Sequence, residues 1–185
     1  TMHSMDLTRG AVLERGCVYI VPLLERLSLS QRLSAIANPK SSTGRLDIFT
    51  RVITDKSHRF DDIAAGYEGQ LYLEVFSRSF TIRVKTGVSL NQLRLIKGDP
   101  KCEEGEMLAL HRKNPILMSE AGQMQQLREP APNNTISLGA NLADKPTGIG
   151  YRAKKNSSLI DLSRVYHYDP GDYWEPVFAD RSHRL

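Results

Sequence analysis

Cysteine is scarce in this sequence, and long apolar runs are absent. The two cysteines, Cys17 and Cys102, lie far apart and form no C-x-x-C pair. Nothing indicates a disulfide framework, so we expect a reducing compartment and a cytoplasmic protein. No apolar run approaches the roughly 18 residues that a membrane span requires, and the start of the chain lacks the apolar core of a signal peptide. We therefore expect no membrane partner.

A strong charge of one sign is also missing. Lysine and arginine number 25 against 21 aspartate and glutamate residues, which leaves a net charge of +4. Proteins that bind duplex nucleic acid usually show a denser basic stripe. Here the cations are spread along the chain, except between Lys40 and Arg51. This distribution favours a small anionic ligand over nucleic acid.

Several motifs of nucleotide and metal chemistry do not occur. The sequence has no G-x-x-x-x-G-K-[ST] loop and no G-x-G-x-x-G after a strand. None of its five histidines belongs to the H-x-E and P-C-x-x-C pattern of zinc nucleobase deaminases, so we expect no zinc site. No G-x-S-x-G elbow supports a Ser-His-Asp triad, although triads are geometric and sequence order does not exclude one.

Short strands between glycine turns predict a mainly β fold, a barrel or a sandwich. In the first strand, residues 17–24, Pro22 indicates a sheet edge or a bulge. Residues 65–69 predict a turn. The other expected strands cover residues 46–53, 70–76, 80–85, 88–96, 135–142 and 158–162.

Helices and irregular segments are expected between these strands. Ser30 is a candidate cap for a short helix over residues 31–37, which Asn38-Pro39 would end. A second helix is predicted over residues 103–113. Residues 129–134 have the composition of a linker. The turn-rich tail at 168–174 carries aromatic residues that we expect to hold it against a surface.

Residues 40–45 (Lys-Ser-Ser-Thr-Gly-Arg) combine two cations, three hydroxyls and a glycine. Arginine supplies a bidentate fork for phosphate and lysine a point charge. The serine and threonine hydroxyls add neutral donors, and Gly44 allows the backbone to approach a ligand closely. Two interpretations stay open from composition: a loop that binds phosphate and positions water, or an ordinary solvated loop.

Glu74 is the second candidate for chemistry. It lies within an alternating strand, on the face of Tyr72 and Phe76 and opposite Leu71, Leu73 and Val75. If that face is buried, desolvation favours the neutral carboxyl, which suits a group that takes a proton from water and returns it. The alternative is an exposed glutamate on the solvent face of a one-sided sheet.

Three weaker candidates remain. Gln92 lies inside an apolar strand, where its amide can bind a base or a neighbouring strand. Asp61 and Asp62 are adjacent acids in a loop, where they can attract a metal ion or simply be solvated.

The order of these motifs resembles the dCTP deaminase and dUTP diphosphatase superfamily of trimeric β proteins. It consists of a cation-Ser-Ser-x-x-Arg-Leu segment, the turn Gly66-Tyr67-Glu68-Gly69, the strand with Glu74, then Gly87 and Gln92. The resemblance covers about residues 6–98. Residues 38–47 look most like the longer bacterial 2'-deoxycytidine 5'-triphosphate deaminases, which carry two such domains in tandem, and residues 148–154 resemble the opening of their second half.

The resemblance separates two branches of the superfamily. The diphosphatase branch uses an aspartate as base just before the Gly-aromatic-x-Gly turn, and Ala64 stands there in this chain. The deaminase branch keeps a glutamate on the following strand, which Glu74 matches. The resemblance thus favours deamination, with Asp61 or Asp62 as conceivable substitutes for the missing base.

The resemblance also implies roles for individual residues in converting dCTP to dUTP and ammonia without zinc. Glu74 would be the general base and acid, Ser41 would orient the water, and Arg45 would stabilise developing charge. Lys40 falls on a triphosphate-binding position, and Ser42 and Gln92 would contact substrate. The nucleotide would bring Mg²⁺, and the protein would be a homotrimer with sites between domains.

The same resemblance gives the expected fold and domains. Residues 1–98 would form a dUTPase-like deaminase domain, a distorted β-barrel or β-clip that lacks its N-terminal strands. Residues 99–134 would be a helical linker, and residues 135–185 the beginning of a second dUTPase-like β domain. A missing portion of the same polypeptide would then complete the fold. Two other functions remain open: a dUTP diphosphatase or bifunctional enzyme, and a nucleotide-binding or assembly module without activity.

Overall fold

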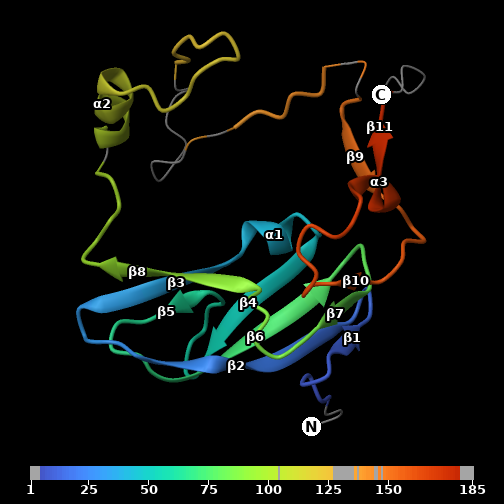
Figure 1. Ribbon diagram of the computed structural model, residues 1–185. Coiled ribbons are helices and arrows are strands. Elements are labelled where there is room, and N and C mark those ends of the chain that lie inside the picture. Colours follow the sequence, from blue (N-terminus) through green and yellow to red (C-terminus); the bar gives the residue numbers. More distant parts are fainter. Residues whose placement is uncertain are drawn as a thin grey trace. The chain divides into compact units, whose positions relative to one another are not determined.

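The computed structural model describes residues 5–103, 105–126, 136, 138–143, 146 and 148–179. The chain divides into two compact units, one of Thr1–Gly98 with Asp144–Leu185 and one of Asp99–Ala143. Figure 1 shows the strands and the short helices of the described residues. In chain order these elements are β1 (Ala11–Leu13), β2 (Val18–Ser28), β3 (Leu33–Pro39), α1 (Ser41–Gly44), β4 (Ile48–Thr54), β5 (Asp62–Ile63), β6 (Glu68–Ser77), β7 (Ile82–Val84), β8 (Asn91–Lys97), α2 (Glu106–Lys113), β9 (Gly150–Ala153), β10 (Ile160–Asp161), α3 (Pro170–Tyr173) and β11 (Trp174–Val177).

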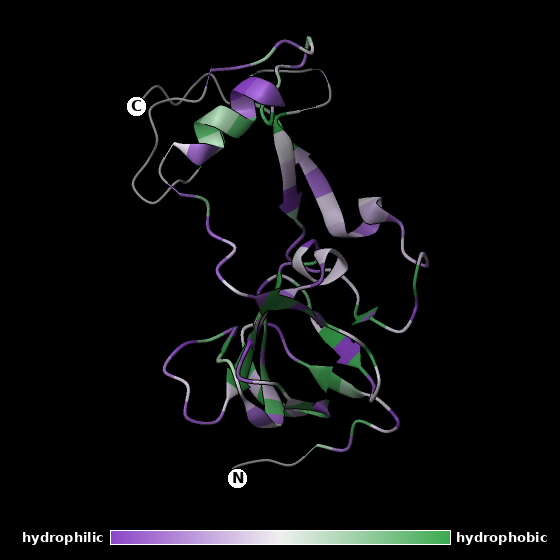
Figure 2. Ribbon diagram, turned by 90° about the vertical axis from the view of Figure 1, so that its left-hand side faces the viewer, coloured by the Kyte–Doolittle hydropathy of each residue, from purple (hydrophilic) through white to green (hydrophobic). Residues whose placement is uncertain are grey.

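The predicted mainly β class is confirmed. The described strands form three-stranded sheets in the orders β1-β7-β10, β2-β6-β4 and β5-β3-β8, and β11 pairs with β9. The pairing is antiparallel except where β10 runs parallel to β7. These sheets do not close into one continuous ladder among the described strands. Figure 2 shows hydrophobic positions concentrated along the strands of the N-terminal sheets.

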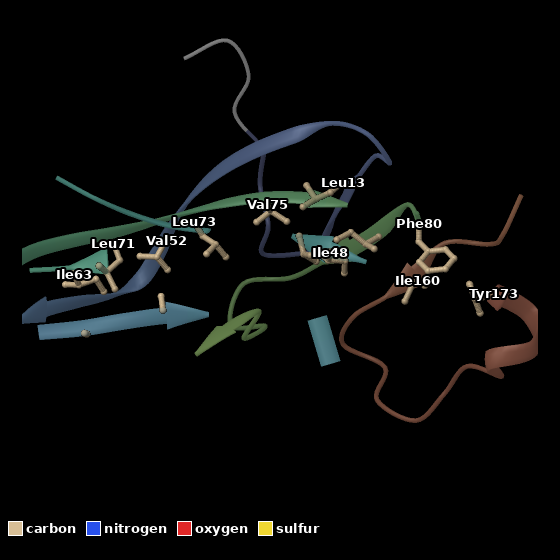
Figure 3. Packing of buried hydrophobic residues seen from close by; sticks show 14 residues of the cluster. Leu13, Ile48, Val52, Ile63, Leu71, Leu73, Val75, Phe80, Ile160 and Tyr173 are labelled. Carbon is tan, nitrogen blue, oxygen red and sulfur yellow. The ribbon is translucent and has the colours of Figure 1, made fainter. Parts of the chain in front are cut away.

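Strand β6 is the centre of the sheet that carries the candidate base. The predicted alternation is confirmed, because Leu71, Leu73 and Val75 are each at most 5% exposed. Figure 3 shows these side chains on one side of the strand, with Val52 and Ile48 of β4 beside them. Burial of this one face turns the intervening residues, Glu74 among them, away from the core.

The expectation for Pro22 is also confirmed. Strand β2 is an edge strand of its sheet, and its register against β6 shifts between Pro22 and Arg26. The amide of Gln70 donates to the carbonyls of Leu23 and Glu25 within the shifted stretch. A side chain therefore replaces the regular ladder bonds where proline has no N–H to donate.

The helix predicted over residues 31–37 is wrong. These residues enter strand β3, which pairs with β8 along its whole length and with β5 at Ala35 and Ile36. Ala35 and Ala37 are almost fully buried. Alanine favours helices locally, but two strand partners and a buried, period-two face outweigh that weak preference. Ser30 instead accepts backbone hydrogen bonds from Leu33 and Gly66.

The other expected elements have mixed outcomes. The turn at 65–69 is confirmed, with Gly66 at a φ of 75°, and the helix predicted over 103–113 is present as α2. The strand predicted over 135–142 is wrong for its described residues, 136 and 138–142, because none of them pairs with a strand. The linker predicted at 129–134 lies outside the described residues.

Aromatic residues of the tail pack as predicted against the N-terminal part of the same unit. Phe80 makes edge-on contacts with Tyr173 and Trp174, at centroid distances of 5.7 and 5.4 Å. Ile160 of β10 is buried beside them (Figure 3). The C-terminal segment is therefore held by both a strand pairing and an aromatic cluster. Within the described part of the chain, none of the helices is long and apolar enough to cross a membrane.

Candidate functional site

The 40–45 segment forms one helical turn, α1, where a loop was expected. The N–H groups of Thr43 and Gly44 both donate to the carbonyl of Lys40, at 2.9 Å each. Thr43 is buried, and its hydroxyl donates to the carbonyl of Leu90 at 2.9 Å. The N–H of Lys40 reaches the same carbonyl at 3.0 Å. One carbonyl before β8 thus anchors both ends of the turn.

The remaining side chains of this turn face solvent. Ser41, Ser42 and Arg45 are exposed and make no side-chain hydrogen bond with another described residue. A methyl group added at Gly44 would meet no atom within 4 Å. Neither the backbone nor the packing therefore requires glycine at this position, and the space above it is open to a ligand. The turn presents unpaired donors on a fixed backbone, as an anion site requires.

Strand pairing brings Gln92 to the same place. Asn38 of β3 lies opposite Gln92 of β8, and Pro39 lies opposite Asn91. The backbone bond from Lys40 to Leu90 continues this pairing past the end of β3. Lys40 and Gln92, which are far apart in sequence, therefore belong to one junction of β3, α1 and β8.

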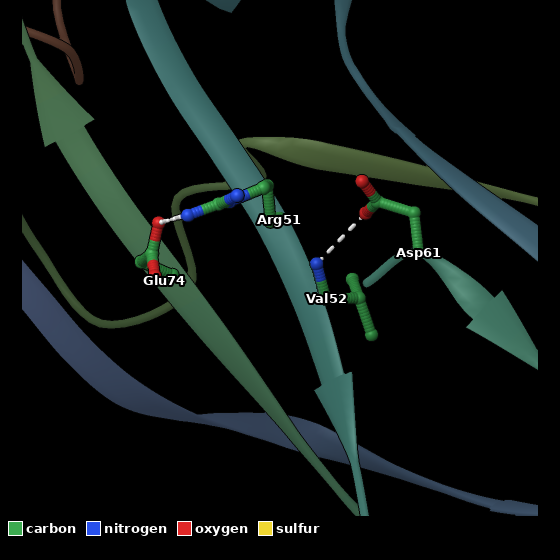
Figure 4. A network of polar contacts seen from close by, with 4 residues as sticks. All are labelled: Arg51, Val52, Asp61 and Glu74. Carbon is green, nitrogen blue, oxygen red and sulfur yellow. Dashed lines mark hydrogen bonds and ion pairs between the residues drawn. The ribbon is translucent and has the colours of Figure 1, made fainter. Parts of the chain in front are cut away.

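Glu74 belongs to a second group, on the outward face of β2-β6-β4. Its side chain is 16% exposed, and its Oε1 accepts hydrogen bonds from Nε and Nη2 of Arg51 at 3.0 and 2.6 Å. Arg51 of β4 lies directly opposite Glu74 of β6 in the strand register. Figure 4 shows the guanidinium extended toward the carboxylate. Glu74 is thus half-buried and paired, which neither of the two sequence interpretations anticipated.

Arg51 was missed as a candidate by sequence reasoning. It ends the basic stretch between Lys40 and Arg51, but nothing local in the sequence indicates that it faces Glu74. Alternation along residues 48–54 places Arg51 on the same face as Phe49, away from the buried Ile48 and Val52. Only the register with β6 turns that observation into a contact. The sequence therefore indicates the outward face on which Arg51 lies. It does not reveal the pairing of Arg51 with Glu74.

Asp61 has a structural role. Its N–H donates to the carbonyl of Val52, and its Oδ1 accepts the N–H of Val52 at 2.8 Å. Its carbonyl accepts the N–H of Ala37. Burial raises the pKa of Asp61 above its ordinary 3.8, against the opposing effects of the Val52 hydrogen bond and the charge of Arg51. Figure 4 shows Asp61 and Glu74 on either side of β4.

Other parts of the described chain offer less for catalysis. No group of three or more His, Cys, Asp or Glu side chains gathers as a metal site within the described residues. A surface hollow of about 480 Å³ lies at the antiparallel pair of β9 and β11. Two of its three cations are already engaged, because Arg152 pairs with Glu175 and Lys154 donates to the carbonyl of Gly171. We therefore place the candidate site at the two groups above.

The structure thus distributes the predicted residues over two groups. Lys40, Ser41, Ser42, Arg45 and Gln92 lie at the β3-α1-β8 junction, and Glu74 lies with Arg51 on the outward sheet face. No hydrogen bond between described residues joins the two groups. The first can hold an anion and water. The second can exchange a proton beside a fixed cation.

Comparison with known proteins adds a family to this geometry. Residues 1–99 match the family described as 2'-deoxycytidine 5'-triphosphate deaminase (DCD) N-terminal domain, and residues 103–185 match the corresponding C-terminal domain. Among solved structures, the chain is similar to the crystal structure of 2'-deoxycytidine 5'-triphosphate deaminase from Agrobacterium tumefaciens, with 44% identity and a TM-score of 0.81. The match covers 97% of this chain and 52% of that chain, so this chain spans about half its length. No curated protein matches.

Proposed function

Because the chain belongs to the 2'-deoxycytidine 5'-triphosphate deaminase family, we propose that the protein converts dCTP and water to dUTP and ammonia. The observation that carries this proposal is Glu74, half-buried on a strand with one carboxylate oxygen held by Arg51. Its Oε2 makes no hydrogen bond with another described residue. A carboxylate with one fixed and one available oxygen is suited to proton transfer with a bound water.

The junction of β3, α1 and β8 supports the binding half of the proposal. Lys40 binds the triphosphate, and Ser42 and Gln92 contact the rest of the nucleotide. Ser41 orients the attacking water, and Arg45 stabilises the charge that develops as C4 becomes tetrahedral. Support comes from the exposed, unpaired side chains of the turn and from the open space above Gly44.

Glu74 shuttles two protons in this mechanism. The water oxygen attacks C4 of cytosine while Glu74 takes one proton from the water and passes it to ring N3. Glu74 then takes the proton of the new C4 hydroxyl and gives it to the exocyclic amine. The C4–N bond breaks, ammonia leaves, and the C4 carbonyl of uracil forms. Every proton of the water is accounted for, and Glu74 returns to its ionised form.

The proposal extends to assembly, metal and location. A homotrimer would cover the outward face around Glu74, where Val18, Ile20 and Phe49 are between 49% and 64% exposed. It would also allow the 40–45 turn of one subunit to meet Glu74 of another.

Mg²⁺ would enter with the triphosphate as part of the substrate. The composition supports a cytoplasmic location, with neither nucleic acid nor membrane as a partner.

Ammonia release from dCTP by the full chain tests the proposal. We expect turnover by the wild type and loss of at least about 100-fold in Glu74→Gln, since general acid–base catalysis contributes about that much. Glu175→Gln is the matched control, because Glu175 is also bonded by an arginine across an antiparallel pair. Full activity in Glu74→Gln would overturn the role of Glu74.

Product analysis separates the competing functions in the same experiment. Pyrophosphate and dUMP from dUTP would indicate a diphosphatase or a bifunctional enzyme. Two observations count against that function: Ala64 occupies the position of the aspartate base, and Asp61 is engaged in structural hydrogen bonds. Tight dCTP binding in a calorimeter without turnover would indicate a binding module. Accumulation of dUTP is the outcome that we expect.

A further inference from the structure

The ion pair between Arg51 and Glu74 is asymmetric. Both Nε and Nη2 of Arg51 donate to the same carboxylate oxygen, Oε1, at 3.0 and 2.6 Å. A bidentate fork would use both oxygens, as arginine does with an isolated carboxylate. Here Oε2 stays available, while Oε1 is fixed in place. The arrangement orients the carboxylate without consuming the atom that would exchange protons.

The ring of Phe60 holds the guanidinium of Arg51 in place. The guanidinium carbon lies 3.9 Å from the ring centroid of Phe60, within the range of a cation–π contact. Phe60 directly precedes Asp61, whose backbone and side chain are bonded to Val52 and Ala37. The anchoring of Asp61 therefore places the ring of Phe60, and the ring helps to place the guanidinium. This sequence of contacts leads from the interior of the sheet to Glu74.

Ordinary sheet stabilisation does not account for this arrangement. Arg152 and Glu175 form a similar pair across β9 and β11, with a hydrogen bond of 2.9 Å from Nε and an ion-pair distance of 2.8 Å from Nη2 to one oxygen. That pair is more exposed, with side chains at 72% and 41% against 47% and 16% for Arg51 and Glu74. Among the described residues, no aromatic ring lies under Arg152. Exposed pairs of this kind contribute little to stability.

We propose that Arg51 is a positioning residue for Glu74 in the reaction, with Phe60 as its support. Arg51 holds Oε1 so that Oε2 points to the attacking water, and its charge helps the protonated Glu74 to release its proton to N3 and then to the leaving amine. This inference rests on the deaminase function proposed above. It assigns Arg51 a role through Glu74 and none in binding the triphosphate.

Steady-state kinetics of the full chain test the assignment. We expect Arg51→Met to lower kcat about 10- to 100-fold, because a small misplacement of a reacting group costs about that much. KM for dCTP should change little. Arg51→Lys should recover part of the rate, and added guanidinium should partly rescue Arg51→Ala. Phe60→Leu should lower kcat by a smaller factor, and Arg152→Met should match the wild type.

The outcomes separate this inference from the proposed function. If Glu74→Gln is inactive while Arg51→Met keeps its kcat within twofold, the positioning role is overturned and the deaminase proposal stands. A rise in KM with unchanged kcat would also overturn it, because Arg51 would then bind substrate. If the wild type releases no ammonia from dCTP, both proposals fail. Should Arg51→Met not fold, the kcat of Arg51→Lys and of Phe60→Leu decides.

Discussion

The hydroxyl of Thr43 donates a 2.9 Å hydrogen bond to the carbonyl of Leu90, and this bond ties the α1 turn to the segment before β8. The carbonyl also accepts the N–H of Lys40. Residues 47 positions apart in the sequence are thereby joined at the proposed nucleotide site. The position of the exposed side chains on this turn therefore depends on the buried side chain of Thr43.

Replacement of Thr43 tests this anchor. Thr43→Val keeps the buried volume but removes the hydroxyl, so we expect a loss of about 1 kcal/mol in the free energy of unfolding and a higher KM for dCTP. Chemical denaturation and steady-state kinetics measure the two effects. Ser42→Ala is the contrast, since its exposed hydroxyl has no described partner. It should raise KM without a change in stability, and equal destabilisation of both variants would contradict the anchor.

Gly44→Ala tests whether a ligand uses the open space above α1. Nothing in the protein would touch the added methyl group, and alanine favours helical backbone, so stability should stay constant or rise by roughly 0.5 kcal/mol. A bound nucleotide that approaches the turn closely would meet the methyl group. We therefore expect weaker dCTP binding by calorimetry. Unchanged affinity would show that the nucleotide does not approach the turn at this point.

Asp61→Asn tests the partly buried carboxyl that is bonded to β4. The pKa of Asp61 is raised above 3.8 by burial, so the folded state holds its proton more tightly than the unfolded state. Its contribution to stability is therefore greatest below pH 3.8 and declines as the pH rises through the raised pKa. Asparagine can still accept the Val52 N–H and tolerates the positive φ of this position.

The expected result is a variant that is more stable than the wild type at pH 7, by a margin that shrinks as the pH falls toward 3.8. Thermal unfolding at several pH values measures this margin. Asp62→Asn is the control, because the exposed Asp62 contacts Arg59 only at 3.8 Å. A stability difference for Asp61→Asn that is constant across the pH range would contradict the argument.

Phe80→Ala tests how the C-terminal segment is attached. Phe80 is buried against Tyr173 and Trp174, and removal of a buried phenylalanine side chain usually costs about 3–5 kcal/mol. We expect lower stability and faster amide hydrogen exchange in β9 and β11. Phe178→Ala is the control, since Phe178 is exposed. Unchanged exchange in β9 and β11 would mean that the position of this strand pair does not depend on the aromatic cluster.

Local patterns predicted some features well because their causes are local. The alternation of Leu71, Leu73 and Val75 identified both the strand and its buried face, since side chains of a strand alternate with a period of two. Pro22 predicted an irregular edge because proline lacks a donor. The helix prediction for residues 31–37 failed for the opposite reason. Ser30 and Asn38-Pro39 suggested the two ends of a helix, and the strands that flank these residues became visible only in three dimensions.

By itself, the sequence determined the mainly β class, the family resemblance and the residue types that chemistry on a nucleotide requires. Those follow from composition, order and short-range alternation. The tertiary structure decided that Thr43 anchors the turn at Leu90, that Gln92 lies at the same junction of β3, α1 and β8 as Lys40, and that Arg51 holds Glu74. Each of these depends on the register between strands distant in sequence. A shift of one residue would turn the side chains to the other face, so register is a property of the whole packed sheet.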